Sequence, residues 1–399
     1  MLFRSEAMRS SCMNNIRIKS VTNVRGFIRD LFQEDYNNLK FEYDENRAYE
    51  TNSKGKVIIS NLIKAPIFDL LGIFQVVKTD DTDNVDAFFS YNRFLSSTKP
   101  YVIYLENPLA PVHYCINRPN SLFSREKLKK VFADKNLKTI VCLSKACKNT
   151  ISNFYDIDDH VNVEQIYPLV RTRKKIDESI IKKKSQNKRL KCLYISSEFE
   201  LKGGEDILKA FGKLDESKFE LLIITKRETV REEDLFKINK LANVTIREFN
   251  LSKDELADVY LESNVLLNPT RQDSFSLVVL EAMKYGNMVL SSDLYAIPEM
   301  VIDNKTGFLV NNIRYRFFNE NKMPNPSVWN HRKKTIYSSF IDDNVVSFLI
   351  DKLNYVEHNR EELTRLCLNS FKQSNSGEFN CDYIKNKWED VYINAVGKC

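Results

Sequence analysis

Glycine is scarce in this sequence, which has only ten glycines among its 399 residues. An average protein has roughly 7%. Five of the ten lie between positions 203 and 307. Since glycine is the residue that most easily adopts left-handed conformations, each of these few positions is expected to mark a special backbone need. The scarcity therefore directs attention to the second half of the chain.

Other absences exclude several classes of protein. No apolar run approaches the roughly 20 residues that a membrane-spanning helix needs, and residues 1–16 lack the apolar centre of a secretion signal. The eight cysteines form no C-x-x-C pair, and the four histidines are scattered. The sequence therefore predicts a soluble, cytoplasmic protein with reduced thiols and no metal site.

The composition is that of a globular protein, with 43% hydrophobic and 29% charged residues. A chain of 399 residues is too long for one ordinary core, so two domains are expected. The formal charge is +6, and ten of the 21 residues in 171–191 are Lys or Arg. This basic segment is our predicted domain boundary, either as a solvated linker or as a surface for anionic lipid headgroups or phosphates.

Short β-branched runs alternate with helical patterns along most of the chain, which predicts an α/β fold with parallel sheets. The expected strands of the second half are 190–196, 219–225, 244–249, 265–268, 288–291 and 308–310. The first half is less regular, with strands expected at 16–21, 56–60, 87–91, 101–105 and 139–143. The chain is expected to end with a helix over 381–396, and 317–336 fits neither pattern, as a surface insertion would.

Two segments of the second half carry chemistry. In the first, Lys202, Gly203 and Gly204 follow a strand and open a helix. A lysine beside helix-start amides suits a diphosphate. In the second, residues 270–286, two carboxylates stand eight positions apart around a helix start. Helix-start amides can bind an anion while carboxylates bind hydroxyls, so this segment suits a phosphorylated sugar; its candidates are Arg271, Asp273, Ser274, Phe275, Ser276 and Glu281.

Segments 202–211, 268–286 and 291–310 resemble, in this order, the donor-binding domain of retaining glycosyltransferases of family 4, the group 1 type. The resemblance implies the GT-B architecture, in which two Rossmann-like domains face an interdomain cleft and a C-terminal helix crosses back. The implied domains are an acceptor-side domain over 1–175, a donor-binding domain over 188–375 and the returning helix over 376–399.

The resemblance also implies site roles. Lys202 would hold the donor pyrophosphate with help from Arg271. Asp273 would touch the transferred sugar beside the amides of residues 274–276. Glu281 would bind the ribose of the nucleotide. Phe249 and Leu251 would lie against the base. In the first half, His113 or the Glu106–Asn107 pair could stand where the family often has an active-site histidine, and a structural histidine is the alternative.

The chain departs from the family pattern at three positions. Asp273 stands where the family usually has glutamate, Ser197 where many members have an arginine, and Asn250 where a glycine is common. Aspartate is one methylene shorter, so the position or choice of the sugar is expected to differ.

The implied reaction is metal-independent, front-face transfer of a sugar from a nucleoside-diphosphate sugar to a glycan or glycolipid hydroxyl, with no cofactor and no nucleic-acid partner. Three alternatives remain: a sugar-nucleotide epimerase, a phosphorylase, and a non-enzymatic polyanion- or lipid-binding protein on the same fold. The basic amphipathic segment 121–132 is expected either to pack its Leu128, Val131 and Phe132 face in the core or to touch an anionic membrane.

Overall fold

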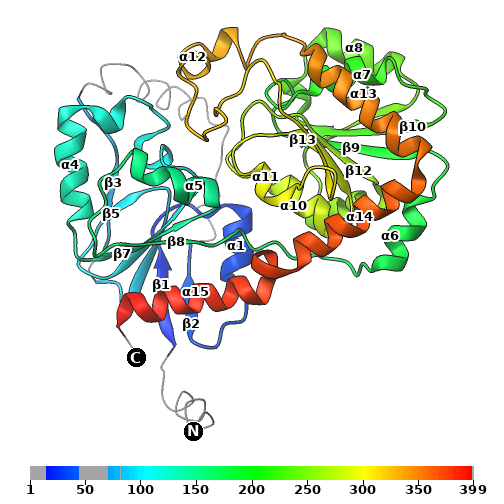
Figure 1. Cartoon of the computed structure of the whole chain (residues 1–399). Coiled ribbons are helices and arrows are strands. Elements are labelled where there is room, and N and C mark those ends of the chain that lie inside the picture. The colour runs from blue at the N-terminus through cyan, green and yellow to red at the C-terminus, as the bar shows by residue number, and fades with distance from the viewer. Residues whose placement is uncertain (1–14, 45–70, 81, 398–399) are drawn as a thin grey trace. The chain divides into compact units, whose positions relative to one another are not determined.

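The computed structural model describes residues 15–44, 71–80 and 82–397, which divide into two compact units. Unit 1 runs to Leu169 and resumes at Cys381, and unit 2 comprises Val170–Asn380. Each unit is built around its own six-stranded parallel sheet (Figure 1). The expected fold class, an α/β protein with two Rossmann-like domains, is confirmed.

The main sheet of unit 1 has the order β2-β1-β4-β6-β7-β8. Its central strands are apolar and buried along their whole length, as expected for parallel strands covered on both faces. A short parallel pair, β3 and β5, stands apart. The expected strand 56–60 lies outside the described residues. The elements are β1 (Ile16–Ser20), α1 (Gly26–Phe32), β2 (Leu39–Glu42), β3 (Val76–Lys78), β4 (Ala87–Tyr91), β5 (Phe94–Ser96), β6 (Tyr101–Leu105), η1 (Ala110–Val112), η2 (Arg118–Asn120), α4 (Leu122–Phe132), β7 (Leu137–Cys142), α5 (Lys145–Thr150), η3 (Ile151–Asn153) and β8 (Asn162–Gln165).

The last helix, α15 (Cys381–Val396), returns to unit 1 and packs beside β4, β6 and β7 (Figure 1). Its Trp388 is fully buried, with its ring 5.0 Å from that of Tyr104 and 5.9 Å from that of Phe89. Glu389 accepts a hydrogen bond of 2.6 Å from the amide of Asn37. The chain therefore completes the core of unit 1 only with its final helix, as the resemblance implies.

The sheet of unit 2 has the order β11-β10-β9-β12-β13-β14. In chain order this is 3-2-1-4-5-6, so the direction of winding reverses between β9 and β12, where open α/β sheets bind ligands. The elements are α6 (Glu178–Ser185), β9 (Leu190–Ser196), α7 (Gly204–Phe211), β10 (Phe219–Thr225), η4 (Arg227–Thr229), α8 (Glu232–Lys240), β11 (Val244–Glu248), α9 (Lys253–Glu262), β12 (Val265–Asn268), α10 (Leu277–Lys284), β13 (Met288–Ser292), α11 (Ile297–Met300), β14 (Gly307–Val310), α12 (Pro326–Trp329), η5 (Arg332–Lys334), α13 (Asp343–His358), α14 (Arg360–Asn375) and η6 (Gly377–Phe379).

The basic segment 171–191 is not the solvated linker of the sequence prediction. Its middle forms α6 inside unit 2, where Ile181 is fully buried. The buried ammonium of Lys184 donates to the carbonyl of Tyr285 at 2.7 Å and to Asn287 Oδ1 at 2.8 Å. Burial lowers the pKa of Lys184 to about 8. This lysine joins α6 to neighbouring helix ends, so it is not part of a polyanion-binding surface.

Candidate active site

A cavity of about 370 Å³ lies in unit 2 and includes residues at the carboxyl ends of β9 and β12. Its polar lining includes Lys202, Asp273, Ser276 and Glu281, and its apolar lining includes Ile224, Phe249, Leu251 and Leu256. The cavity therefore joins a charged region to an apolar one at the switch point of the sheet. A larger groove of about 950 Å³, between α4 and the segment 151–163 of unit 1, holds none of the predicted site residues.

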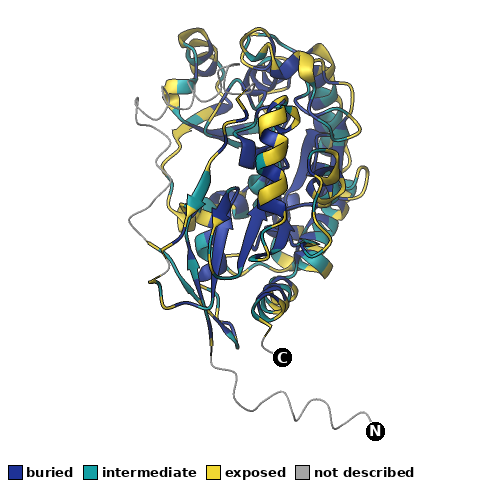
Figure 2. Ribbon diagram, turned by 90° about the vertical axis from the view of Figure 1, so that its left-hand side faces the viewer, coloured by how far each residue is buried: buried dark blue, intermediate teal, exposed yellow. Residues whose placement is uncertain are grey.

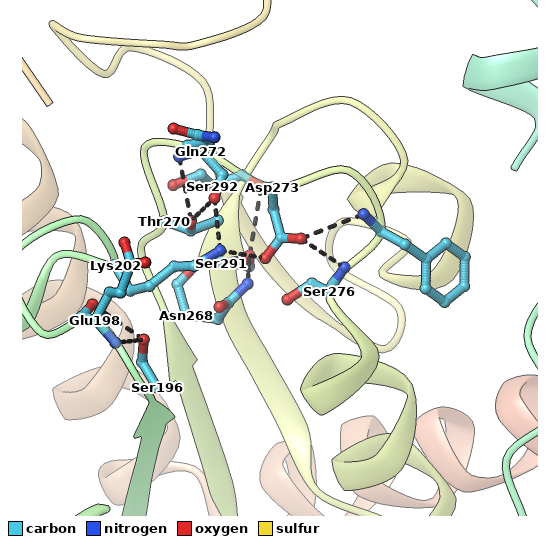
Figure 3. Close-up of polar contacts among 11 residues, drawn as sticks. Ser196, Glu198, Lys202, Asn268, Thr270, Gln272, Asp273, Ser276, Ser291 and Ser292 are labelled. Carbon is cyan, nitrogen blue, oxygen red and sulfur yellow. Dashed lines mark hydrogen bonds and ion pairs between the residues drawn. The ribbon is translucent and has the colours of Figure 1, made fainter. Parts of the chain in front are cut away.

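Lys202 and Asp273 come from loops that follow different strands, and they meet in this cavity (Figure 3). Lys202 Nζ lies 2.7 Å from Asp273 Oδ2 and donates to the carbonyl of Gln272 at 2.5 Å. The two side chains are only 22% and 18% exposed. The structure thus brings the predicted phosphate anchor and the predicted sugar-binding carboxylate into direct contact.

The second oxygen of Asp273 caps the N-terminal end of α10. Oδ1 accepts hydrogen bonds from the amides of Ser276 at 2.9 Å and Phe275 at 3.3 Å. Ser276 itself has φ +68°, a left-handed conformation that a serine adopts only under constraint from its surroundings. Two of the amides that the sequence predicts to bind an anion, those of Phe275 and Ser276, therefore already bind the carboxylate of Asp273.

The two glycines of the lysine loop serve close packing. Gly203 has φ +75°, and a Cβ there would lie 2.5 Å from the carbonyl oxygen of Pro269, in the loop that carries Asp273. A Cβ on Gly204 would lie 2.3 Å from the ring of Phe199. Neither glycine lines the cavity. Gly203 thus lets the loops after β9 and β12 approach, which brings Lys202 and Asp273 together, and Gly204 makes room for Phe199 within the loop after β9.

Glu281 lines the other part of the cavity from the second turn of α10. Its Oε2 accepts a hydrogen bond of 2.8 Å from the buried hydroxyl of Tyr260 on α9. Burial, followed by the charge of Glu281, raises the pKa of Tyr260 well above its usual range, so the hydroxyl stays a donor. The Tyr260 ring stacks on that of Tyr285, with centroids 5.7 Å apart. The sequence does not indicate this role of Tyr260, because its partner Glu281 lies on another helix.

Arg271, predicted as a phosphate clamp, does not line the cavity. Its guanidinium is 4% exposed and lies 2.9 Å from Asp206 Oδ2, a fully buried carboxylate on α7. Its second partner is the carbonyl of Phe340, at 2.6 Å. Arg271 thus connects α7 and the 269–276 loop to the segment 311–341, which includes the predicted insertion. Two further candidates, Ser274 and Phe275, also lie outside the cavity lining, and the Phe275 side chain is buried.

The candidate histidine of the first half, His113, lies in unit 1 just after η1, with φ +59°. The neighbouring Glu106 is buried and engaged, since it accepts from the hydroxyls of Tyr91 and Tyr114 and lies 3.5 Å from the Arg25 guanidinium. These contacts give Glu106 a structural role in the loop that carries His113.

Within the described residues, one group of acidic side chains is close enough to hold a cation: Glu205, Glu233 and Asp234. It lies outside the cavity lining and includes ion pairs of Arg231 with Glu205 and of Lys237 with Asp234. The sequence also contains two D-x-D triplets. Asp158 of the triplet 156–158 lies 2.5 Å from His160 Nδ1, and the other triplet is 81–83. Asp83 of this triplet pairs with Lys19, at 2.5 Å, and residue 81 lies outside the described residues.

Comparisons with known proteins agree with this geometry. Residues 175–316 match the family model described as "Glycosyl transferases group 1". A Klebsiella pneumoniae protein named "Uncharacterized 41.2 kDa protein in cps region" is 30% identical over 169 residues, 42% of this chain and 43% of its own length. A D-inositol 3-phosphate glycosyltransferase of Streptomyces avermitilis is 38% identical over 60 residues, 15% of this chain and 13% of its own.

The matched part of this chain therefore spans less than half the length of either relative. Among solved structures, HepE from Anabaena in complex with UDP-glucose aligns over 95% of this chain and 99% of its own, with a TM-score of 0.59 and 12% identity. This likeness shows the fold. Residues 175–316 thus resemble the group 1 glycosyltransferases, and the likeness to solved structures shows the GT-B fold.

Proposed function

We propose that this protein is a retaining glycosyltransferase that moves a sugar from a nucleoside-diphosphate sugar to a hydroxyl of a glycan or glycolipid acceptor. The observation that carries the proposal is the cavity of unit 2, where Lys202 and Asp273 lie in one region and Glu281 in another, beside the apolar Phe249 and Leu251. A nucleoside-diphosphate sugar carries matching groups: a diphosphate, sugar hydroxyls and a flat base. The solved HepE complex with UDP-glucose, a protein of the same fold, supports this choice of donor.

In the proposed reaction, Lys202 and the amides at the start of α10 stabilise charge that develops on the departing diphosphate. Asp273 orients the transferred sugar, and the leaving phosphate oxygen takes the proton of the attacking hydroxyl on the same face. Lysine and amides can supply this stabilisation without a metal, so we include metal independence in the proposal. We also propose that the protein is located in the cytoplasm and makes peripheral contact with an anionic membrane.

A thermal-shift screen against a panel of nucleotide sugars tests the donor site. A donor present at 100 times its dissociation constant should stabilise the protein by about 2.7 kcal/mol. Lys202→Ala and Glu281→Ala should remove this stabilisation while the circular dichroism spectrum stays unchanged. Lys209→Ala is the matched control, because Lys209 lies on α7, directly after the loop that carries Lys202, but pairs with the exposed Asp343. Normal turnover by both site variants would refute the assignment.

The alternatives are separated by their products. Transfer releases free nucleoside diphosphate in proportion to the glycosylated acceptor, whereas an epimerase changes the sugar without net transfer and a phosphorylase requires inorganic phosphate. A non-enzymatic polyanion binder would keep salt-sensitive binding to polyanions after Lys202→Ala.

A further inference from the structure

A second cavity of unit 2, of about 430 Å³, shares a loop with the candidate active site. In the loop after β9, Ser196, Ser197 and Lys202 line the first cavity, and residues 198–201 line the second. Its other walls are residues 228–231, between β10 and α8, and Tyr337, so we call it the Tyr337 pocket. The pocket lies at the carboxyl ends of the strands, where open α/β sheets bind ligands, and it has the size of a small-ligand site.

Polar contacts hold two walls of the Tyr337 pocket together. The amide of Phe199 donates to the hydroxyl of Thr229 at 3.3 Å, and Arg231 Nε lies 2.6 Å from Glu200 Oε1. Both contacts join the loop after β9 to the segment after β10. The pocket is therefore formed before a ligand binds, which lowers the entropy that binding costs.

The segment 311–341 brings Tyr337 to this pocket. The amide of Phe317 donates to the carbonyl of Arg271 at 2.9 Å, and the amide of Arg271 donates to the carbonyl of Leu201 at 3.2 Å. Leu201 is itself part of the pocket lining. The segment is thus fixed, through Arg271, to the loop that forms the opposite wall.

Tyr337 is 41% exposed, although most large apolar side chains of the molecule are buried. Figure 2 shows that the strands are mostly buried and that exposed residues lie mainly on helices and loops. On α4, for instance, the predicted core face of Leu128, Val131 and Phe132 is buried. Tyr337 also lies beyond residues 175–316, which match the family model. An aromatic ring that lines a pocket and stays exposed can contact a ligand.

The charged groups of the pocket are mainly hydrogen-bond acceptors. Glu198, Glu200 and Glu228 supply three carboxylates, against the single guanidinium of Arg231. Glu198 and Glu228 are exposed, and within the described residues neither side chain has a hydrogen-bond or ion-pair partner. Carboxylates accept hydrogen bonds from hydroxyl groups and repel anions. The lining therefore favours a ligand that carries hydroxyls and no negative charge.

We propose that the Tyr337 pocket binds a neutral sugar unit of the acceptor glycan, with the sugar ring on Tyr337 and its hydroxyls donating to Glu198 and Glu228. A sugar ring has an apolar C–H face and hydroxyls at its edge, which match an aromatic ring beside unpaired carboxylates. Because one loop lines both cavities, a glycan bound here lies beside the region of Lys202 and Asp273. The inference rests on the proposed transfer reaction, and it adds a part of the acceptor site to unit 2.

A glycan array with neutral, amino and acidic oligosaccharides tests this pocket on the full chain, without a donor. The protein should bind at least one neutral oligosaccharide, whose affinity is then measured by calorimetric titration. Tyr337→Ala should lower this affinity at least about tenfold, because the stacking surface is lost, and Tyr337→Phe should retain most of it. Glu198→Gln with Glu228→Gln should lower it by about three- to tenfold, since charge-assisted hydrogen bonds become neutral ones. Tyr355→Ala is the matched control, because Tyr355 is 45% exposed on α13 of unit 2 and does not line the pocket.

The sugar-binding role of the pocket fails on any of three results. One is that the unmodified chain binds no neutral oligosaccharide, and another is that Tyr337→Ala binds it as tightly as the unmodified chain does. The third is Tyr337-dependent binding of amino or acidic sugars alone, which would assign the pocket to a charged ligand. Thermal shift by nucleotide sugars, measured in parallel, reports on the donor site separately. A normal shift without Tyr337-dependent glycan binding would reject the pocket alone, whereas no shift by any nucleotide sugar would count against the proposed function.

Discussion

The ammonium of Lys202 lies 2.7 Å from the carboxylate of Asp273, and the same carboxylate accepts from the amides of Phe275 and Ser276. One acidic side chain thus occupies both groups that are suited to bind a donor phosphate. A diphosphate that enters this region must displace part of these contacts, so Asp273 competes with the phosphate even though it is predicted to orient the sugar. The identity of this residue should therefore affect binding and transfer in opposite directions.

Asp273→Asn tests this competition. Removal of the negative charge should free Lys202, and the affinity for nucleoside diphosphate alone should rise by roughly two- to fivefold, the effect expected for a partly exposed ion pair. Transfer should fall by about 10² or more if the carboxylate orients the sugar in the transition state. Calorimetric titration with nucleoside diphosphate and steady-state kcat measure the two effects. Weaker diphosphate binding by the variant would contradict the competition.

Tyr260→Phe tests whether the buried hydroxyl positions Glu281. The substitution keeps the ring and its stacking on Tyr285 but removes the 2.8 Å hydrogen bond to Oε2. Hydrogen bonds to charged groups contribute about 1.5–3 kcal/mol, so KM for the donor should rise by roughly tenfold or more. The value of kcat should change little, because Glu281 is predicted to bind the ribose equally in the ground and transition states.

The control for this effect is Tyr285→Phe, whose hydroxyl accepts from the amide of Arg173 at 2.7 Å and is not part of the cavity lining. A donor analogue without ribose hydroxyls provides a second comparison. The difference between the unmodified chain and Tyr260→Phe should shrink with this analogue. An equal loss with both donors would assign Tyr260 a purely structural role.

Much of unit 2 could be predicted from the sequence, because its strands are apolar, β-branched runs bounded by turn residues. The strands 190–196, 219–225 and 265–268 agree with β9, β10 and β12 at both ends. Short strands with mixed composition were missed, among them β2 and β8. Strand β8 has the sequence Asn-Val-Glu-Gln, and only its pairing with β7 identifies it as a strand.

The side chains whose surroundings could not be predicted are those whose partners lie far away in the chain. Arg271 was predicted to help hold the donor pyrophosphate, since nothing local indicates that Asp206, 65 positions earlier, is buried against it. Lys184 was counted with a solvated basic run, although its ammonium binds the carbonyl of Tyr285, about 100 positions later. Composition reports the charge of such residues, but only the fold shows where that charge is neutralised.

Arg271→Met tests whether this arginine is structural. Arg271 is 4% exposed and Asp206 is fully buried, and Asp206 Oδ1 also accepts from the amide of Asp342 at 2.7 Å. Removing one partner of a buried ion pair costs about 3–5 kcal/mol. For a unit of this size the melting temperature should fall by roughly 10 °C. Differential scanning calorimetry measures the shift, and Arg314→Met, an exposed arginine of the adjoining segment, is the control. A large loss of turnover with an unchanged melting temperature would instead support the phosphate-clamp prediction.

Glu205 should make the stability of unit 2 depend on pH. Burial is the main cause that raises the pKa of Glu205 to about 7, from an ordinary value of 4.5, and the nearby Arg231 opposes the shift. The folded protein therefore binds this proton more tightly than the unfolded chain. The stabilising contribution is present in full below about pH 4.5 and is lost as the pH rises through about 7.

Glu205→Gln should remove this dependence, because glutamine has the shape of the protonated acid and does not ionise. At pH 8 the variant should be more stable than the unmodified chain by about 1–3 kcal/mol, and the difference should shrink toward pH 5. Melting temperatures between pH 5 and pH 8 measure the effect. Glu233→Gln is the matched control, since Glu233 lies 3.8 Å from the same arginine but is 63% exposed. Parallel stability profiles for the Glu205 variant and the unmodified chain would show that Glu205 keeps an ordinary pKa in the folded protein.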